Sequence, residues 1–216
     1  DKFSFSSLGT ASDIGNLTQS KSWPAGHSSG DNAYCTGGTT GSRLDVIDKV
    51  SFSSDGNSDD IGNLTVTRSR IAGCSSLTHG YAVSGNTGSA SDVIDKFSFS
   101  SDSDATDVGN LSVAKHSGGG CSSGTHGYHG CGYSNTDVID KFSFSSDSDS
   151  VDIGNSTEGR GDGVSGTSSL TYGYLQGGYI PPDSNVIEKF SFSSDGDATD
   201  VGDLSQAHQG GSAQHV

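Results

Sequence analysis

A short segment recurs five times in this chain, and that repetition constrains the fold more than any other feature. The heptapeptide DKFSFSS begins at Asp1, Asp95 and Asp140, and close variants begin at Asp48 and Glu188. Successive copies start 47, 47, 45 and 48 residues apart. A fixed period of this length is typical of repeat proteins, in which each unit buries its apolar side chains against its neighbours. We therefore divide one domain, residues 1–216, into repeats 1–47, 48–94, 95–139 and 140–187 and a partial repeat 188–216.

The composition shows why such units need one another. Only 29% of the residues are hydrophobic and the formal net charge is −15, values that without the repeats would favour a disordered chain. No apolar run approaches the ~18 residues that cross a bilayer, so we expect no membrane insertion. The acidic balance also argues against nucleic acid, whose protein partners carry basic patches.

Each repeat is predicted to contain four short strands. In residues 93–99, Val93 and Phe97 alternate with Ile94 and Ser98, which is the period of a β-strand. Residues 107–112, the Gly-Cys-Ser-Ser stretch and the chain from Gly127 onwards give three more. No segment keeps a helical period. Four strands in about 45–50 residues is the size of one propeller blade, so the sequence predicts an all-β propeller.

The same residues resemble a known family. A tyrosine column followed by a glycine pair or its remnant, a variable loop, Val-Ile-Asp-Lys-Phe-Ser-Phe and a turn into an outer strand resembles a degenerate kelch repeat; the tyrosines are Tyr34, Tyr81, Tyr128 and Tyr174. Kelch outer strands usually carry Trp, whereas that region here holds Ile or Val. The near-identical copies, rich in Asp and Ser, also resemble repeat-rich appendage or tail-fibre proteins of marine bacteriophages and cyanophages, which implies a place on a virion.

The resemblance to kelch repeats implies how the ring would close. In kelch strand order the chain enters at the third strand of a blade. Five blades would then form if the tail 210–216 supplied an inner strand to the blade begun by residues 1–17, which would remove open sheet edges. The alternative is an arc of a longer ring, or an open stack of repeats.

Four sequons stand at the same position of successive repeats, with acceptors Asn16, Asn63, Asn110 and Asn155. In a secreted eukaryotic chain these side chains would carry glycans. The fifth copy has Asp203 in that column, and Asn and Asp both suit a turn that bonds its own backbone. The column therefore predicts either glycosylation sites or structural turns.

Other reactive side chains favour structural roles. The Asp clusters lack a calcium-binding loop and are interpreted as solvated turns. The four cysteines have no zinc-site spacing and are expected to be free, packed thiols. The lysine column suggests an ion pair within each repeat or a solvated row, and the tripeptide beginning at Arg160 lies in a Gly-rich segment expected to be flexible. We predict no catalytic residues, no metal site and no cofactor.

The functional hypothesis follows from where the copies differ. Variation concentrates in four loops, residues 39–44, 86–91, 133–136 and 179–184, and loops on a rigid scaffold commonly carry function. We expect a non-enzymatic protein, extracellular or on a virion surface, that recognises host-surface glycans and contacts other virion subunits. The alternative is a glycosylated subunit of an extracellular filament or coat; an enzyme on this scaffold is the third reading.

Overall fold

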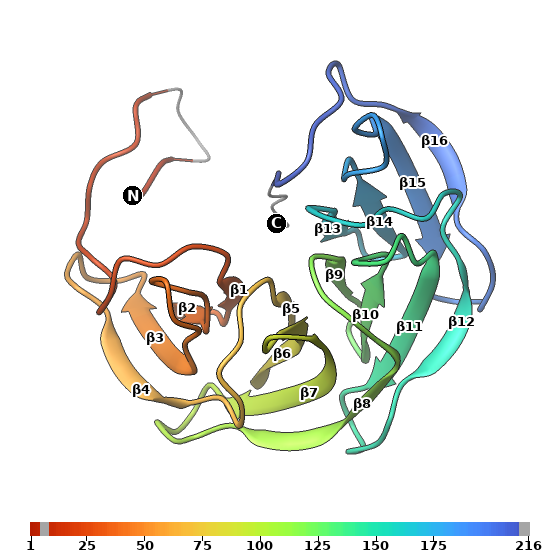
Figure 1. Ribbon diagram of the computed structural model, residues 1–216. Helices are drawn as coiled ribbons and strands as arrows, with labels where there is room; N and C mark the ends of the chain where they lie inside the picture. Colours follow the sequence, from red (N-terminus) through yellow and green to blue (C-terminus); the bar gives the residue numbers. More distant parts are fainter. Residues whose placement is uncertain (5–8, 212–216) are drawn as a thin grey trace.

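The computed structural model describes residues 1–4 and 9–211 and is all β. Sixteen strands form four sheets of four antiparallel strands, each sheet following chain order (Figure 1). No helix occurs in the described part of the chain. The strand content and the order within each repeat confirm the all-β prediction, and the sheets are consistent with propeller blades.

The strands of the first two sheets are β1 (Ala25–Ser28), β2 (Asn32–Thr36), β3 (Val46–Ser51), β4 (Asp59–Asn63), β5 (Ala72–Ser75), β6 (His79–Asn86), β7 (Ala90–Ser98) and β8 (Thr106–Lys115). Those of the last two are β9 (Gly119–Ser122), β10 (His126–Gly130), β11 (Val138–Ser143), β12 (Val151–Asn155), β13 (Ser165–Ser168), β14 (Tyr172–Gln176), β15 (Val186–Ser191) and β16 (Thr199–Asp203).

The first strand of every sheet lies innermost and the fourth lies at the rim (Figure 1). Glycines let the inner strands approach closely. A Cβ added at Gly73 would lie 2.2 Å from the carbonyl oxygen of Gly26, and one at Gly120 would lie 2.4 Å from that of Gly73. Only a residue without a Cβ fits such a backbone contact.

Apolar side chains are buried between consecutive sheets. Phe97 belongs to a cluster with Tyr34 of the preceding sheet, whereas Ile94 belongs to one with Phe142 of the following sheet. The alternation predicted for residues 93–99 is thus confirmed, with both faces covered. Each fully buried side chain of this size contributes about 1.5–3 kcal/mol, which explains how a chain poor in apolar residues can form a core.

The tyrosine column joins the sheets through aromatic stacking. Three of its four tyrosines stack on a phenylalanine of the next sheet, with ring centroids 4.7 Å apart for Tyr34–Phe99, 4.7 Å for Tyr81–Phe144 and 4.8 Å for Tyr128–Phe192. Such pairs contribute roughly 0.5–1.5 kcal/mol beyond their buried area. The column is therefore a repeated structural contact.

Cross-strand pairs explain one departure among the copies. In the second sheet Gly80 pairs with Phe97, whose ring would collide with a Cβ there. In the first sheet the corresponding pair is Ala33 with Val50. Val50 is smaller than Phe97, and Ala33 is larger than Gly80. The two positions therefore change together and fill the same space.

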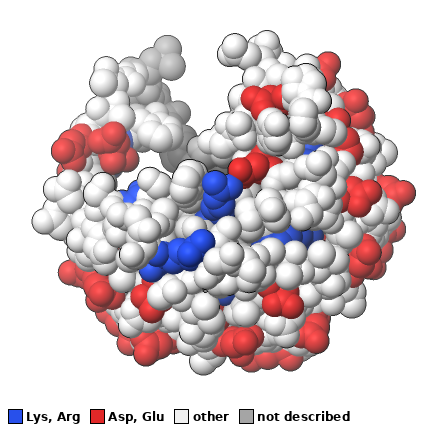
Figure 2. Space-filling model, viewed as in Figure 1, with Lys and Arg blue, Asp and Glu red and all other residues white. Residues whose placement is uncertain are grey.

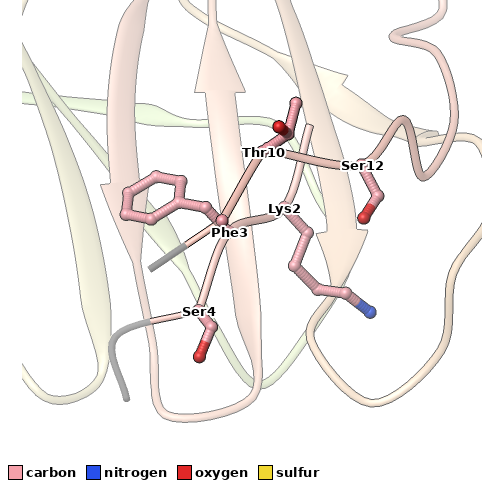
Figure 3. Close-up of a pocket in the computed structure, with 6 residues that line it drawn as sticks. Lys2, Phe3, Ser4, Thr10 and Ser12 are labelled. Carbon is pink, nitrogen blue, oxygen red and sulfur yellow. The ribbon is translucent and has the colours of Figure 1, made fainter. Parts of the chain in front are cut away.

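The N-terminal segment contains an isolated β-bridge outside the four sheets. Lys2 and Ser12 form an antiparallel bridge, and Lys2 pairs with Asp55 just as Lys49 pairs with Asp102. These contacts place residues 1–4 and 9–12, which we call the N-terminal hairpin, beside the first sheet. Figure 3 shows Phe3 and Lys2 projecting to opposite sides of the hairpin.

Phe3 of the N-terminal hairpin is more exposed than the equivalent side chains of the four sheets. Phe3 is 57% exposed, whereas its counterpart Phe97 is 2% exposed. On the last sheet, no described atom lies within 4 Å of a Cβ built at Gly202. A Cβ built at the equivalent Gly154 of the preceding sheet would instead collide with Gly196. We call the region between the last sheet and the hairpin the seam. The tail predicted to close it, 210–216, lies outside the described residues from position 212 onwards.

Candidate ligand-binding face

Two sets of segments meet on one face of the sheets. The loops between second and third strands end there, as do the connectors, which we define as the segments joining each sheet to the next. The connectors are linked by backbone hydrogen bonds: the N–H of Arg70 donates to the carbonyl of Trp23 (2.9 Å), and that of Ser117 donates to Arg70 (3.0 Å). Val164 donates likewise to Ser117. We call this side the loop face.

A buried ion pair fixes each connector. The four pairs are Lys21–Asp48 (2.6 Å), Arg68–Asp95 (3.0 Å), Lys115–Asp140 (2.8 Å) and Arg160–Glu188, and the side chains of all eight residues are completely buried. Each cation lies within a connector or, as Lys115 does, directly before one, and each acid begins the DKF, DKV or EKF segment of the following repeat. Charges this deep are tolerated because they are paired.

The local electrostatics follow from this pairing. Burial raises the pKa of the Asp48 carboxyl, but hydrogen bonds from Lys21 and Thr18 outweigh burial, so its pKa lies below the ordinary value. The pKa of Asp140 is lowered in the same way, against burial, by Lys115. Both acids are therefore ionised in the folded protein at neutral pH.

The sequence analysis missed this cation column, although its signal was present. A basic residue stands three positions after the hydroxyl of every sequon, and His208 stands in the same position after Ser205. The interpretation of the lysines in the DKF and EKF segments was also wrong in detail. Lys49 and Lys96 pair with acids of the next repeat, not of their own.

A depression of about 490 Å³ lies on the loop face, within the size range of ligand pockets. Its larger side chains are Trp23, Arg43, Arg70, Asn86, His116 and Tyr133. Figure 2 shows Lys and Arg gathered near the centre of this view and Asp and Glu around its periphery. We call this hollow the central depression.

Trp23 and Arg70 occupy a strained position. Their φ angles are 53° and 57°, in the left-handed region that favours glycine, and Gly210 takes the same place in the last connector. The Arg70 guanidinium lies over the Trp23 ring, 4.5 Å from its centroid, and pairs with Asp162 at 2.6 Å. Trp23 is nevertheless 56% exposed. Large side chains held in such a conformation at a surface hollow indicate a functional site.

A second aromatic pair also lines the central depression. The His116 ring stacks on Tyr133 with centroids 4.5 Å apart. Burial lowers the pKa of His116, and the nearby Arg70 and Arg43 lower it further although Asp162 opposes them. The imidazole is therefore neutral at pH 7 and able both to donate and to accept hydrogen bonds.

The structure brings together three of the four predicted loops. Loop 39–44 contributes Thr39, Gly41 and Arg43, loop 86–91 contributes residues from Asn86 to Ala90, and loop 133–136 contributes Tyr133. Loop 179–184 does not line the depression, but the N–H of Tyr179 donates to the carbonyl of Asp162 beside it.

The sequons have a structural role in the fold. The backbone N–H and side-chain amide of Asn63 donate to Asp104 of the next repeat, at 2.8 and 3.3 Å. The Thr65 hydroxyl donates to the buried Asp95 at 2.6 Å. The same amide-to-carboxylate contact recurs at Asn110 and Asn155, and Asn16 uses its backbone N–H alone. All four asparagines are exposed, and their glycosylation stays a prediction.

The remaining candidates are structural. All four cysteines are free, and burial raises the pKa of the Cys74 thiol to about 11. Arg160 is completely buried against Glu188 and so holds its connector in place, and the flexibility expected of the surrounding Gly-rich segment stays a prediction. His129 bonds the Ser84 hydroxyl, but both side chains are fully buried. Within residues 1–4 and 9–211, no group of His, Cys, Asp and Glu is arranged to hold a metal.

Comparisons with known proteins leave the site to be judged on its own geometry. No protein-family model matches the chain, and no curated protein is similar to it. Among the described residues there is no helix that could span a membrane.

Proposed function

We propose that the chain forms a kelch-like propeller of five blades, closed at the seam between the last sheet and the N-terminal hairpin. The repeated cation and acid positions that join the other sheets are also occupied on the two sides of the seam. His208 holds the position of Arg68, and Asp1 holds that of Asp95. The Nδ1 atom of His208 is buried and has no hydrogen-bond partner among the described residues. Gly210 already bonds the connector before it, at Gly163.

Two other columns change in a complementary way at the seam. Elsewhere an Asn, such as Asn63, faces an acid, such as Asp104. At the seam Asp203 would face Thr10, which avoids setting two carboxylates together. Lys189, whose counterparts pair with an Asp, lies over the Tyr172 ring, and that Asp is replaced by Leu8 in the N-terminal copy.

A double-mutant cycle tests closure. In the structure the ring centroids of Tyr34 and Phe97 are 5.4 Å apart. In a closed ring Tyr174 would pack on Phe3 in the same way. Alanine substitutions of Tyr174 and Phe3 should then couple by about 0.5–1.5 kcal/mol in the free energy of unfolding. The Tyr34/Phe97 cycle is the matched control. Coupling at the control and none at the seam would contradict closure.

For the function, we propose a non-enzymatic protein, displayed outside cells or on a virion, that binds host-surface glycans at the central depression. One observation carries the proposal: the exposed Trp23 and the partly buried Arg70 are held in strained conformations and stack on each other where three variable loops converge. Aromatic faces suit the apolar side of a sugar ring, and Asn86 and His116 supply hydrogen-bond partners for hydroxyls. The resemblance to phage appendage proteins supports the location.

A glycan array tests this function. The wild-type protein should bind a defined subset of sugars, and a variant with residues 133–136 replaced by a Gly-Ser linker should lose that binding. Replacing the turn 169–171, which lies on the opposite face, is the matched control and should change nothing. No binding of the wild-type protein to any sugar would refute the function.

A further inference from the structure

We propose that the central depression selects saccharides that carry an anionic group, a carboxylate or a sulfate. This inference rests on the proposed glycan-binding function and names its ligand class. It was not foreseeable from the charge balance, because 26 acidic residues against 11 basic ones predict repulsion of anions. The local arrangement of Arg43 and Arg70 reverses that expectation at one place on the surface.

Arg43 is the first reason. Arg68, Arg70 and Arg160 each pair with a carboxylate. Arg43 forms no such pair within the described part of the chain; its Nε and Nη2 atoms donate to the side-chain oxygen of Asn86, at 3.1 and 2.7 Å. This contact orients the guanidinium without neutralising it. A cation held beside a hollow in a strongly acidic protein is an acceptor site for an anion.

Arg70 adds a second charge. Its guanidinium is fixed between the Trp23 ring and Asp162, and only one of its nitrogens contacts that carboxylate. The planar fork of a guanidinium can hold two acceptors, so a ligand oxygen can join Asp162 there. The field of both arginines reaches His116, whose pKa they lower together with burial. Arg43 thus leaves one positive charge beside the depression that no carboxylate of the described residues pairs with, although the chain as a whole is acidic.

The aromatic rings decide in favour of a saccharide over a free inorganic anion. Trp23 and Tyr133 are 56% and 54% exposed and both line the depression. Their faces offer apolar surface that a sulfate or phosphate ion would leave unused. A pyranose ring carrying a carboxylate uses both features, because its C–H face packs on an aromatic ring while its charge meets the guanidinium.

The test compares matched ligands. Trigalacturonate and its methyl ester differ in charge but not in sugar, and 3′-sialyllactose and lactose form a second pair with and without an acidic sugar. Calorimetric titration at low salt should show at least one acidic member binding tenfold or more tighter than its neutral counterpart. This preference should shrink as salt is raised, since exposed charges are screened.

Charge-removing variants locate the effect. Arg43→Gln should reduce the acid-to-neutral affinity ratio at least fivefold. Lys96→Gln is the matched control, because it removes one positive charge from an exposed pair on the blade rim, and its ratio should equal that of the wild type. An acid preference that survives both Arg43→Gln and Arg70→Gln would overturn the assignment to this site.

The outcomes separate the two proposals. Binding of neutral sugars as tight as that of their acidic counterparts overturns the anion inference and leaves glycan binding standing. Binding of inorganic sulfate alone, with no saccharide bound, overturns both the ligand class and the function. Failure of the protein to bind any sugar on the array or in the titrations also overturns both.

Discussion

The two faces of the sheet assembly are built from the same repeats, but the repeats are uniform on one face and variable on the other. On the turn face, opposite the loop face, the first and second strands are joined by the same serine turn four times. Ser29, Ser76, Ser123 and Ser169 each accept the N–H three residues later at 3.0 Å. On the loop face, by contrast, the equivalent position of successive connectors holds different residues, namely Trp23, Arg70 and Ser117. Uniformity thus marks the scaffold, and variation marks the candidate site.

The largest loss of stability is expected when a buried ion pair of the scaffold is broken. Arg68→Met removes a cation and leaves Asp95 charged in a fully buried place. The free energy of unfolding should fall by about 3–5 kcal/mol. Denaturant unfolding measures the loss. Lys96→Met, at a partly exposed pair, should cost about 1 kcal/mol or less; equal losses in the two variants would show that the connectors do not depend on these pairs.

A slightly smaller effect is expected at the inner glycine column. Gly120→Ala places a Cβ 2.4 Å from the backbone oxygen of Gly73, so two inner strands must separate. Overpacking of this kind should destabilise the protein by about 3 kcal/mol. Thermal unfolding provides the measurement. Gly124→Ala is the control, since no atom lies within 4 Å of its Cβ position, and we expect it to leave the melting temperature nearly unchanged.

The scaffold should also be sensitive to acid. Burial lowers the pKa of His27 from 6.5 to about 4, although a hydrogen bond to the Cys74 carbonyl opposes the shift. Between these values the unfolded chain binds more protons, so stability must fall as the pH falls from about 6.5 to 4. The loss from this residue is roughly 2–3 kcal/mol.

Unfolding measured across that pH range tests the histidine. His27→Thr, which introduces the residue found at the same position in the fourth sheet, Thr167, should flatten the pH dependence. A curve as steep as that of the wild type would assign the acid sensitivity to other groups, of which the buried His129, with its lowered pKa, is the first.

The smallest effect on stability is expected on the loop face itself. Trp23→Ala should change the free energy of unfolding by no more than about 0.5 kcal/mol, because the ring is largely exposed. Sugar binding, measured by the same array, should nevertheless be lost. Leu77→Ala, at a turn-face side chain that is 94% exposed, should alter neither property. Loss of binding in the leucine variant would erase the distinction between the faces.

Much of the fold could be predicted because it is repeated. A strand period at residues 93–99 and four strands in each copy were visible without coordinates, and a contact that recurs in every repeat leaves a column in the sequence. The cation column escaped notice because Lys21, Arg68 and their counterparts differ in type and stand among variable residues. Their partners lie about 27 residues away on the next repeat, which no local pattern reveals.

The candidate site was predictable only in part. Variation identified the loops that contain Arg43 and Tyr133, since both lie where the copies differ most. It did not identify Trp23 or Arg70, because the connectors are short and look like spacers in sequence. Their importance depends on backbone conformation and on stacking across two repeats, both of which appear only once the sheets are assembled around one centre.

Hydrogen exchange with a bound saccharide tests the central claim most directly. With trigalacturonate, or the tightest binder found on the array, at saturating concentration, protection should appear in the connectors around Trp23 and Arg70 and in loop 133–136. The serine turns around Ser76 and Ser123 should exchange as they do in the free protein. Protection confined to those turns, with the loop face unchanged, would contradict the account.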